Sequence, residues 1–267
     1  MDDWTAELAA AREAARRAGT MLRQSIGGAN EVYFKGEVNL VTDCDRRAQE
    51  MIFDDLHGRF SGHDFLGEEN LSRDTGSDFQ WIVDPLDGTT NFAHRFPIYS
   101  VSIGLRHRDE VVVGVVFDPS RDEEFRAVRG GGAFLNDSPL SVSAVADLGR
   151  GLLATGFPYD IRQSRDNIGH FLNFIVRAQA VRRCGSAALD LCYVAAGRFD
   201  GFWEMKLNPW DAAAATLIVR EAGGLTTDFS GRPIRTTHPE VLASNGLIHA
   251  SMLDVLALKG DDFHDRT

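Results

Sequence analysis

One acidic stretch, Trp81 to His94 (WIVDPLDGTTNFAH), constrains the fold of this chain more than any other. Three large apolar residues run directly into Asp84 and Pro85, and a second carboxylate follows at Asp87. Proline removes a backbone donor and fixes φ, so we expect a strand to end at Pro85. The pattern predicts a buried strand that delivers two carboxylates to its end.

The residues that follow this strand are suited to begin a helix beside an anion. Gly88 tolerates unusual backbone angles, and Thr89 or Thr90 can cap a helix. Free N–H groups at a helix start attract phosphate. Two carboxylates beside a phosphate would repel it unless divalent cations lie between them, so the stretch indicates hard metals such as Mg²⁺.

The same stretch has a second interpretation. D-x-x-D around a proline is also an ordinary strand-to-turn connection, in which the aspartates accept hydrogen bonds from nearby backbone groups. A short motif alone does not separate the two interpretations. The remainder of the chain has to decide between them.

Length and charge limit the classes of protein to consider. At 267 residues the chain can bury a large core, which predicts one domain over 1–267, built from halves of about 1–148 and 149–260. A net charge of −11 disfavours nucleic-acid binding, which needs a basic face. It leaves small anionic substrates open, because bound cations reverse the local field.

The sequence gives no sign of a membrane segment or a disulfide framework. No apolar run approaches the roughly 20 residues that cross a bilayer, and the N-terminus lacks the order of a signal peptide. We therefore expect no membrane partner and a cytoplasmic location. Cys44, Cys184 and Cys192 are odd in number and lack zinc-site spacing, so we interpret them as reduced thiols.

Periodicity predicts helices and strands in both halves. The expected helices are 3–25, 45–60, 167–180, 186–196, an alanine-rich helix opened by Asp211, and 248–258. The expected strands are 32–34, 65–69, the segment up to Pro85, 99–105, 110–117, 123–128, 133–135, 151–155, 201–204, 225–228 and 241–243. The middle section should form a mostly antiparallel sheet.

Several acids fall at strand ends or helix starts, where α/β proteins collect ligands. They are Glu68, Glu69, Asp84, Asp87 and Asp211. With these acids in place the sequence resembles the inositol monophosphatase family of Mg²⁺-dependent, lithium-sensitive phosphatases, from Lys35 to about Asn245. The resemblance rests on three motifs in order: Gly67-Glu68-Glu69, Asp84-Pro85-Leu86-Asp87-Gly88-Thr89-Thr90-Asn91-Phe92, and Trp210-Asp211-Ala212-Ala213-Ala214 leading to Glu221-Ala222-Gly223-Gly224.

The resemblance implies a site for two or three Mg²⁺ ions. Glu68, Asp84 and the carbonyl of Leu86 would hold the first ion. Asp84, Asp87 and Asp211 would hold the second. Oxygen-only ligands are those that Mg²⁺ prefers, and the absence of histidine from the motif positions disfavours zinc.

The resemblance also implies roles in catalysis and in substrate binding. The catalytic residues would be Glu68, Thr89 and Asp84, with Thr89 and Glu68 orienting the attacking water. The backbone amides of Gly88 and Thr89 would take phosphate oxygens. The substrate-binding residues would be Asp87, Gly88, Thr89, Ala187, Glu204 and Asp211.

Residues far along the chain would determine which alcohol, the part of the ester that carries the phosphate, is recognised. Glu204 matches a family position that hydrogen-bonds substrate hydroxyls, although an acid at a strand end can also be simply solvated. Ser186 and Ala187 match a wall of the substrate pocket, and their small size equally suits helix packing.

Four further positions stay open between function and surface. Lys35, with Asp43 and Asp45, matches the family's mobile loop for a third metal, or is a solvated charge followed by a helix cap. Glu69 would act near the metals through water. The pair Arg182-Arg183 is a solvated face or a contact for a ligand or subunit.

The resemblance implies a layered αβαβα sandwich of the sugar-phosphatase type in the α/β (α+β) class. An antiparallel sheet would lie in the N-terminal half and a second, mixed sheet in the C-terminal half, and the protein would be a homodimer. We expect hydrolysis of a small polyol phosphate, with inositol 1-phosphate first. Histidinol phosphate, fructose 1,6-bisphosphate and 3′-phosphoadenosine 5′-phosphate are competing substrates, and a regulatory or scaffold protein is the alternative of another class.

Clustered carboxylates repel one another when no metal is bound. Asp87→Asn should therefore abolish turnover and leave the fold stable or more stable.

Overall fold

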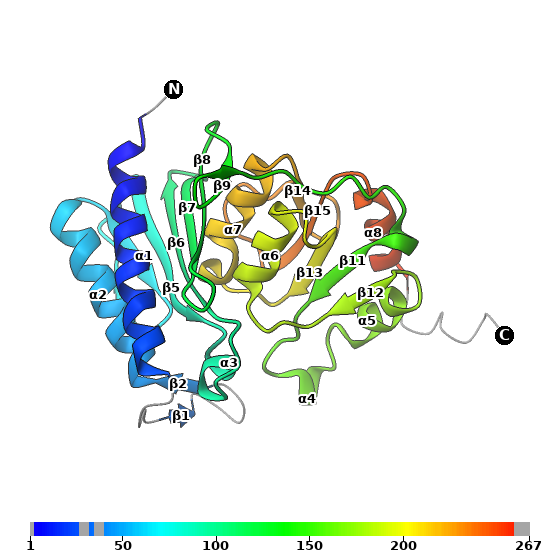
Figure 1. The fold of residues 1–267 in the computed structure, drawn as a ribbon, viewed down its shortest axis with the longest axis horizontal. Helices are drawn as coiled ribbons and strands as arrows, with labels where there is room; N and C mark the ends of the chain where they lie inside the picture. The colour runs from blue at the N-terminus through cyan, green and yellow to red at the C-terminus, as the bar shows by residue number, and fades with distance from the viewer. Residues whose placement is uncertain (1–2, 27–31, 35–39, 259–267) are drawn as a thin grey trace.

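Alternating layers of helices and sheets make up the chain (Figure 1). The computed structural model describes residues 3–26, 32–34 and 40–258. The helices of these residues are α1 (Thr5–Ser25), α2 (Asp43–Arg59), α3 (Thr89–Ala93), α4 (Ile161–Ser164), α5 (Ile168–Ile175), α6 (Ala187–Ala195), α7 (Pro209–Glu221), α8 (His249–Leu256) and the 3₁₀ turn η1 (Leu148–Arg150).

Two large sheets form the frame. The N-terminal sheet has the strand order β10-β9-β8-β7-β6-β5-β3-β4, and the C-terminal sheet has the order β12-β11-β13-β15-β14. The strands are β1 (Val32–Phe34), β2 (Leu40–Thr42), β3 (Asp64–Gly67), β4 (Ser72–Arg73), β5 (Phe79–Asp87), β6 (Ser100–His107), β7 (Glu110–Asp118), β8 (Glu123–Val128), β9 (Ala133–Leu135), β10 (Ser138–Pro139), β11 (Leu152–Thr155), β12 (Ala180–Arg182), β13 (Gly201–Met205), β14 (Leu225–Thr227) and β15 (Glu240–Ser244).

Strand directions match the expected α+β sandwich. Within the N-terminal sheet only β3 and β5 pair in parallel among the described strands. In the C-terminal sheet β11 is parallel to β12 and β13, whereas β15 is antiparallel to β13 and β14, so this sheet is mixed. The short pair β1 and β2 is antiparallel and separate.

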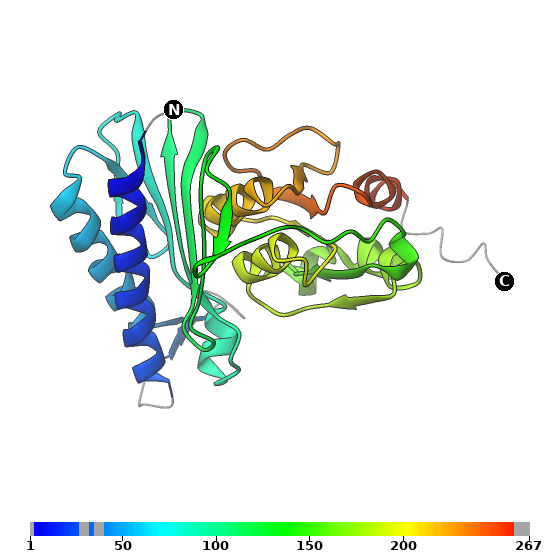
Figure 2. The same ribbon diagram turned by 45° about the horizontal axis from the view of Figure 1, so that its top comes forward.

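The helices cover both sheets and fill the space between them. Figures 1 and 2 show α1 and α2 on the outer face of the N-terminal sheet, α6 and α7 between the sheets, and α5 and α8 on the far face of the C-terminal sheet. One cluster of buried apolar residues joins β7 and β8 to α6, α7 and β13. The order is therefore the predicted αβαβα.

The sequence predicted that the strand with the two aspartates ends at Pro85, and this prediction was wrong. β5 continues to Asp87, and its register against β6 shifts between Asp84 and Asp87. A bulge leaves the residues between them without ladder partners, so the missing N–H of proline costs no sheet hydrogen bond.

The predicted helix 167–180 is too long. α5 ends at Ile175, where the N–H groups of Arg177 and Ala178 both bond to the carbonyl of Phe174 and close a turn. Residues Ala180–Arg182 then pair with β11 as an edge strand. Sequence periodicity cannot show this, because the partner strand lies almost 30 residues earlier.

Helix α7 lies unusually close to the N-terminal sheet. Ala212 to Ala215 are all buried, and two of them, Ala213 and Ala214, meet glycines on β6 and β7. A Cβ added at Gly114 would lie 2.5 Å from the backbone oxygen of Ala214, and one at Gly104 would lie 3.3 Å from the Ala214 nitrogen. Small residues on both sides thus set the position of the helix that begins with Asp211.

Gly114→Ala should destabilise the protein by about 1–3 kcal/mol, because the α7 backbone must move to admit the methyl group. Gly58→Ala is the matched control, since nothing lies within 4 Å of a Cβ at that helical position. The control should be neutral or stabilising by up to about 1 kcal/mol. Urea denaturation of both variants measures the difference, and equal stabilities would contradict the close packing.

A buried histidine joins the last helix to the C-terminal sheet. His249 is 3% exposed; its Nε2 lies 2.9 Å from the Thr227 hydroxyl and its Nδ1 lies 2.8 Å from the Ser244 hydroxyl. The Thr227 hydroxyl already donates to the carbonyl of Asp228, so it accepts from Nε2–H. Burial lowers the pKa of His249 to about 4, so the ring is neutral in the folded protein.

This histidine should make stability fall with acid. The unfolded chain takes up a proton below about pH 6.5 and the folded chain only below about pH 4, so the unfolding free energy falls through that window. The loss should be of order 1–3 kcal/mol. His249→Gln should remove it, and carboxyl titrations common to both proteins cancel in the difference. Urea denaturation from pH 7 to 4 measures this; parallel curves would contradict it.

Within the described part of the chain, no helix is both long and apolar enough to cross a membrane. All three cysteines are free thiols, as the sequence indicated.

Candidate active site

Three elements bring the predicted acids to one place. β5 ends with Asp84 and Asp87, and Glu68 follows β3, which runs parallel beside it with Gly67 opposite Val83. Asp211 lies in the first turn of α7, where its carboxylate accepts a 2.6 Å bond from the Asn208 amide in a capping box. Because parallel strands end at the same edge of a sheet, Glu68 and Asp84 become neighbours.

A buried glutamine fixes the segment that carries Glu68. Gln49 of α2 is 2% exposed, and its Oε1 accepts a 2.8 Å bond from the amide of Glu69. A Cβ at Gly67 would lie 2.2 Å from the same oxygen, so this position needs glycine. The glycine of the Gly-Glu-Glu motif therefore admits the side chain that positions the acids.

The acids act strongly on one another. Burial, followed by the charges of Glu68, Asp87 and Asp211, raises the pKa of Asp84 well above its usual value. Burial raises the pKa of Asp87 to about 6, although hydrogen bonds from Ser186 and from the first amides of α6 oppose it. Burial also raises the pKa of Asp211 to about 8.

These carboxylates fit Mg²⁺ by their chemistry. Among the described residues no three acids, histidines or cysteines already stand as a preassembled metal cage. The case for a cation is electrostatic: buried carboxylates that repel one another gain most from a divalent ion, and oxygen donors suit Mg²⁺.

Asp87 has a structural role that the sequence did not indicate. Its carboxylate accepts bonds from the Ser186 hydroxyl (2.5 Å) and from the amides of Ala188 (2.9 Å) and Ala187 (3.3 Å). The end of β5 thus caps the N-terminus of α6 across 100 residues of chain. An asparagine at position 87 would turn one acceptor into a donor, so the expectation that Asp87→Asn leaves the fold unharmed needs revision.

The segment after Asp87 packs against the same region. Gly88 has φ of 94°, and a Cβ there would lie 3.0 Å from the Ile98 oxygen and 3.1 Å from the Gly185 oxygen. The side chain of Asn91 donates to the carbonyls of Ile98 and Cys184, each at 2.8 Å. The segment Gly88–Asn91 therefore packs directly against Cys184 and Gly185, and we call this contact, together with the bonds from Asp87 to α6, the joint.

Thr89 does not cap α3, contrary to the sequence prediction. Gly88 occupies the cap position, and no side chain bonds to the helix start. The Thr89 hydroxyl instead lies 3.0 Å from Oδ1 of Asp45 and 3.1 Å from the carbonyl of Leu86. Asp45 is completely buried at the start of α2, whereas Thr89 keeps 6% of its surface exposed.

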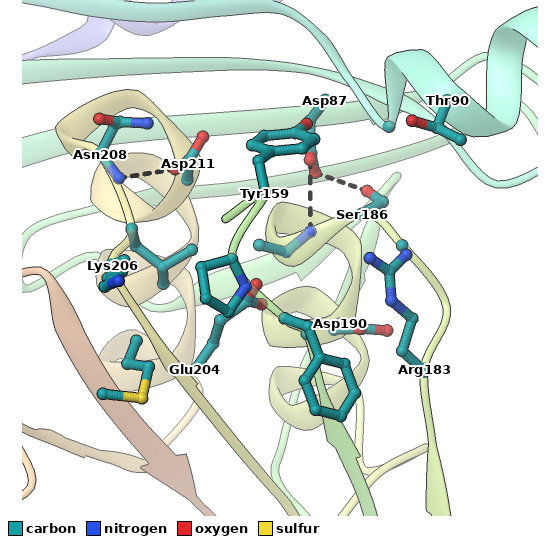
Figure 3. A pocket seen from close by; sticks show the side chains of 18 residues that line it. Asp87, Thr90, Tyr159, Arg183, Ser186, Asp190, Glu204, Lys206, Asn208 and Asp211 are labelled. Carbon is teal, nitrogen blue, oxygen red and sulfur yellow. Dashed lines mark hydrogen bonds between the residues drawn. The ribbon is translucent and has the colours of Figure 1, made fainter. Parts of the chain in front are cut away.

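A cleft opens beside this joint (Figure 3). Five of the predicted site residues line it: Asp87, Gly88, Ala187, Glu204 and Asp211. Burial, followed by the charge of Asp190, raises the pKa of Glu204 well above its usual value. Burial raises the pKa of Asp190 itself to about 8. The cleft thus has an acidic end and, away from it, a wall that carries two carboxyl groups beside Arg183.

Sequence reasoning missed several residues of the cleft. Tyr159, Asp190 and Lys206 belong to none of the three motifs, yet all of them line the cleft. Arg183 of the pair Arg182-Arg183 lines it too, which favours the ligand-contact interpretation for that one arginine. The expectation for Lys35 lies outside the described residues.

The fold and the cleft together define a class: an α+β sandwich with a cluster of buried acids at the end of β5 and a cleft beside that cluster. A family model described as "Inositol monophosphatase family" matches residues 3–259, and the chain belongs to that family of phosphoric monoester hydrolases.

Named relatives cover nearly the whole chain. An "Inositol-1-monophosphatase" of Synechocystis is 43% identical over 92% of this chain and 87% of its own length. A "Nus factor SuhB" of Escherichia coli is 42% identical over 90% of this chain and 91% of its own length. The crystal structure of the suhB protein from Bartonella henselae superposes with a TM-score of 0.88 at 40% identity, over 95% of this chain and 99% of that one.

Asp84→Asn should stabilise the metal-free protein at pH 7 and abolish its response to Mg²⁺. An asparagine carries no charge to repel Glu68 and Asp87, and it can still accept the 3.0 Å bond from the Leu86 amide. Each kcal/mol gained raises the unfolding midpoint by about 2–4 °C. Thermal unfolding in a chelator and in Mg²⁺ measures both effects. If the unfolding midpoint of the wild type is the same in chelator and in Mg²⁺, the metal assignment is refuted.

Proposed function

We propose that this protein hydrolyses the phosphate monoester of a small polyol, with inositol 1-phosphate as the first candidate. The observation that carries the proposal is the joint at the end of β5. There, buried and mutually repelling carboxylates adjoin the Gly88–Thr89 amides, and Glu204 lies across the cleft.

The residues present suit Mg²⁺, and Glu68, Asp84, Asp87, Asp211 and the carbonyl of Leu86 would hold it. The bound ions would polarise the phosphate and lower the pKa of a bound water, so that hydroxide is available as the nucleophile at neutral pH.

Thr89 and Asp45 would prepare the attacking water. The Thr89 hydroxyl donates toward Asp45, which leaves its lone pairs free to accept a hydrogen bond from water. Such a bond orients the water oxygen toward phosphorus, and the buried carboxylate of Asp45 can receive the proton that Thr89 passes on. Glu68, next to Asp84, would hold the same water from its other side.

The phosphate and the alcohol would be bound by different walls. The amides of Gly88 and Thr89 would donate to phosphate oxygens. Glu204, whose raised pKa favours the neutral carboxyl, can both donate to and accept from hydroxyl groups. This pair of walls favours a hydroxyl-rich alcohol over one that carries a second phosphate.

A regulatory or scaffold role is the alternative of another class, since some relatives bear the name "Nus factor SuhB". All the motif acids are present in this chain, and they are buried together at the cost of mutual repulsion. Asp87 and Asp211 also accept hydrogen bonds at helix starts, but Asp84 caps no distant helix and is buried beside three other acids. A scaffold alone has no need of Asp84 there, so hydrolysis is the better-supported function.

Purified protein should release phosphate from inositol 1-phosphate in millimolar Mg²⁺, and Li⁺ should inhibit it. Sugar, histidinol and nucleotide phosphates complete the panel of substrates, and absence of phosphate release from all of them would refute the proposal.

Glu204→Ala should raise KM for the preferred polyol phosphate about tenfold, since one hydrogen bond is lost. Its kcat on a generic aryl phosphate, which lacks those hydroxyls, should change less than about twofold and is the internal control.

A further inference from the structure

An exposed aromatic residue stands in the cleft outside the three acidic motifs. Tyr159 is 54% exposed and belongs to the loop between β11 and α4. It lines the cleft together with Asp87 and Asp211. A single exposed tyrosine needs no explanation in itself, but its place in the cleft beside the acids puts it within reach of a bound ligand.

The base of the loop is held by a buried network. The side chain of Asn167 donates to the carbonyl of Gly156 (2.6 Å) and to the hydroxyl of Thr155 (2.8 Å). The indole of Trp203 donates to the same asparagine at 2.7 Å. Both ends of the segment 156–167 are therefore fixed to β11 and β13.

The tip of the loop is held by a double ion pair. Nζ of Lys206 lies 2.6 Å from Asp160, the residue after Tyr159, and 2.5 Å from Asp166. Lys206 itself lies in the chain between Glu204 and Asp211 and has φ of 62°. The lysine thus ties the loop of Tyr159 to the segment that carries two predicted substrate residues.

The loop holds the tyrosine against the acidic end of the cleft. Figure 3 shows its ring between Asp87 and Asp211. The charges that act on its hydroxyl are those of Glu68, Asp211, Asp84 and Asp87. No hydrogen bond from this hydroxyl to another described residue is present, so its O–H remains available to a ligand.

We propose that Tyr159 is a substrate-contacting residue, whose hydroxyl donates a hydrogen bond to a phosphate oxygen, and that Lys206 is the positioning residue that holds it there. The inference rests on the proposed function and adds a donor to the phosphate site from the C-terminal half. A neutral phenol is suited to this place, because it can donate to an anion without adding a charge to compete with the metals.

The decisive measurement is the affinity for inorganic phosphate in saturating Mg²⁺, by calorimetry, together with KM and kcat for the preferred ester. Tyr159→Phe keeps the ring and loses only the hydroxyl. Loss of one hydrogen bond to a charged group should weaken phosphate binding and kcat/KM about tenfold. The rise of the unfolding midpoint in Mg²⁺ should stay at the wild-type value, which excludes damage to the metal site.

Lys206→Met should raise KM with a smaller effect on kcat, and Lys206→Arg should restore most of the loss. Added salt should raise KM of the wild type more than that of Lys206→Met, because only the wild type has the screened ion pairs. Arg198→Met is the matched control: it removes another exposed double contact, to Glu123 outside the cleft, and should leave KM unchanged.

Equal phosphate affinity in the wild type and Tyr159→Phe overturns the proposal and leaves the hydrolytic function intact. A wild type that hydrolyses none of the esters overturns the function instead. In that case the phosphate-binding comparison still decides the role of Tyr159.

Discussion

The hydrogen bonds between the Asp87 carboxylate and the start of α6 are the interaction on which the rest of the structure depends. They join the end of β5 in the N-terminal sheet to α6, one of the two helices between the sheets. Gly88 and Asn91 extend this joint to Gly185 and Cys184. Together with the buried apolar cluster between β7, β8, α6 and α7, this joint holds the two halves of the chain beside each other, and acids from both halves line the cleft.

Motifs and periodicity could predict the architecture and the acidic cluster. The three acidic motifs each sit where a strand ends or a helix begins, and both facts are local in the sequence. The close packing of α7 was also foreseeable, since four consecutive alanines suit a narrow space. Periodicity therefore predicted most of the elements and their type, whereas the layered architecture and the expected reaction came from the family resemblance that the motifs carry.

What the sequence could not show depends on contacts between distant segments. The bulge at Pro85 can be recognised only when the pairing of β5 with β6 is known. The end of α5 depends on β12, an edge strand that pairs with β11. Gln49 can be understood only once α2 lies against Gly67. Tyr159 belongs to none of the motifs, and its position depends on the ion pair between Asp160, the next residue, and Lys206, which lies 47 residues after the tyrosine.

The double duty of Asp87 also bears on how this chain can change over time. With Asp87 holding a metal as proposed, selection for turnover and selection for a stable contact with α6 would act on the same carboxylate, so neither could relax the position alone. A descendant that gave up hydrolysis and kept the fold for another purpose would still need an acceptor there for Ser186 and α6. An intact aspartate at position 87 is thus a poor marker of activity, whereas Asp84, which caps no distant helix, is a better one.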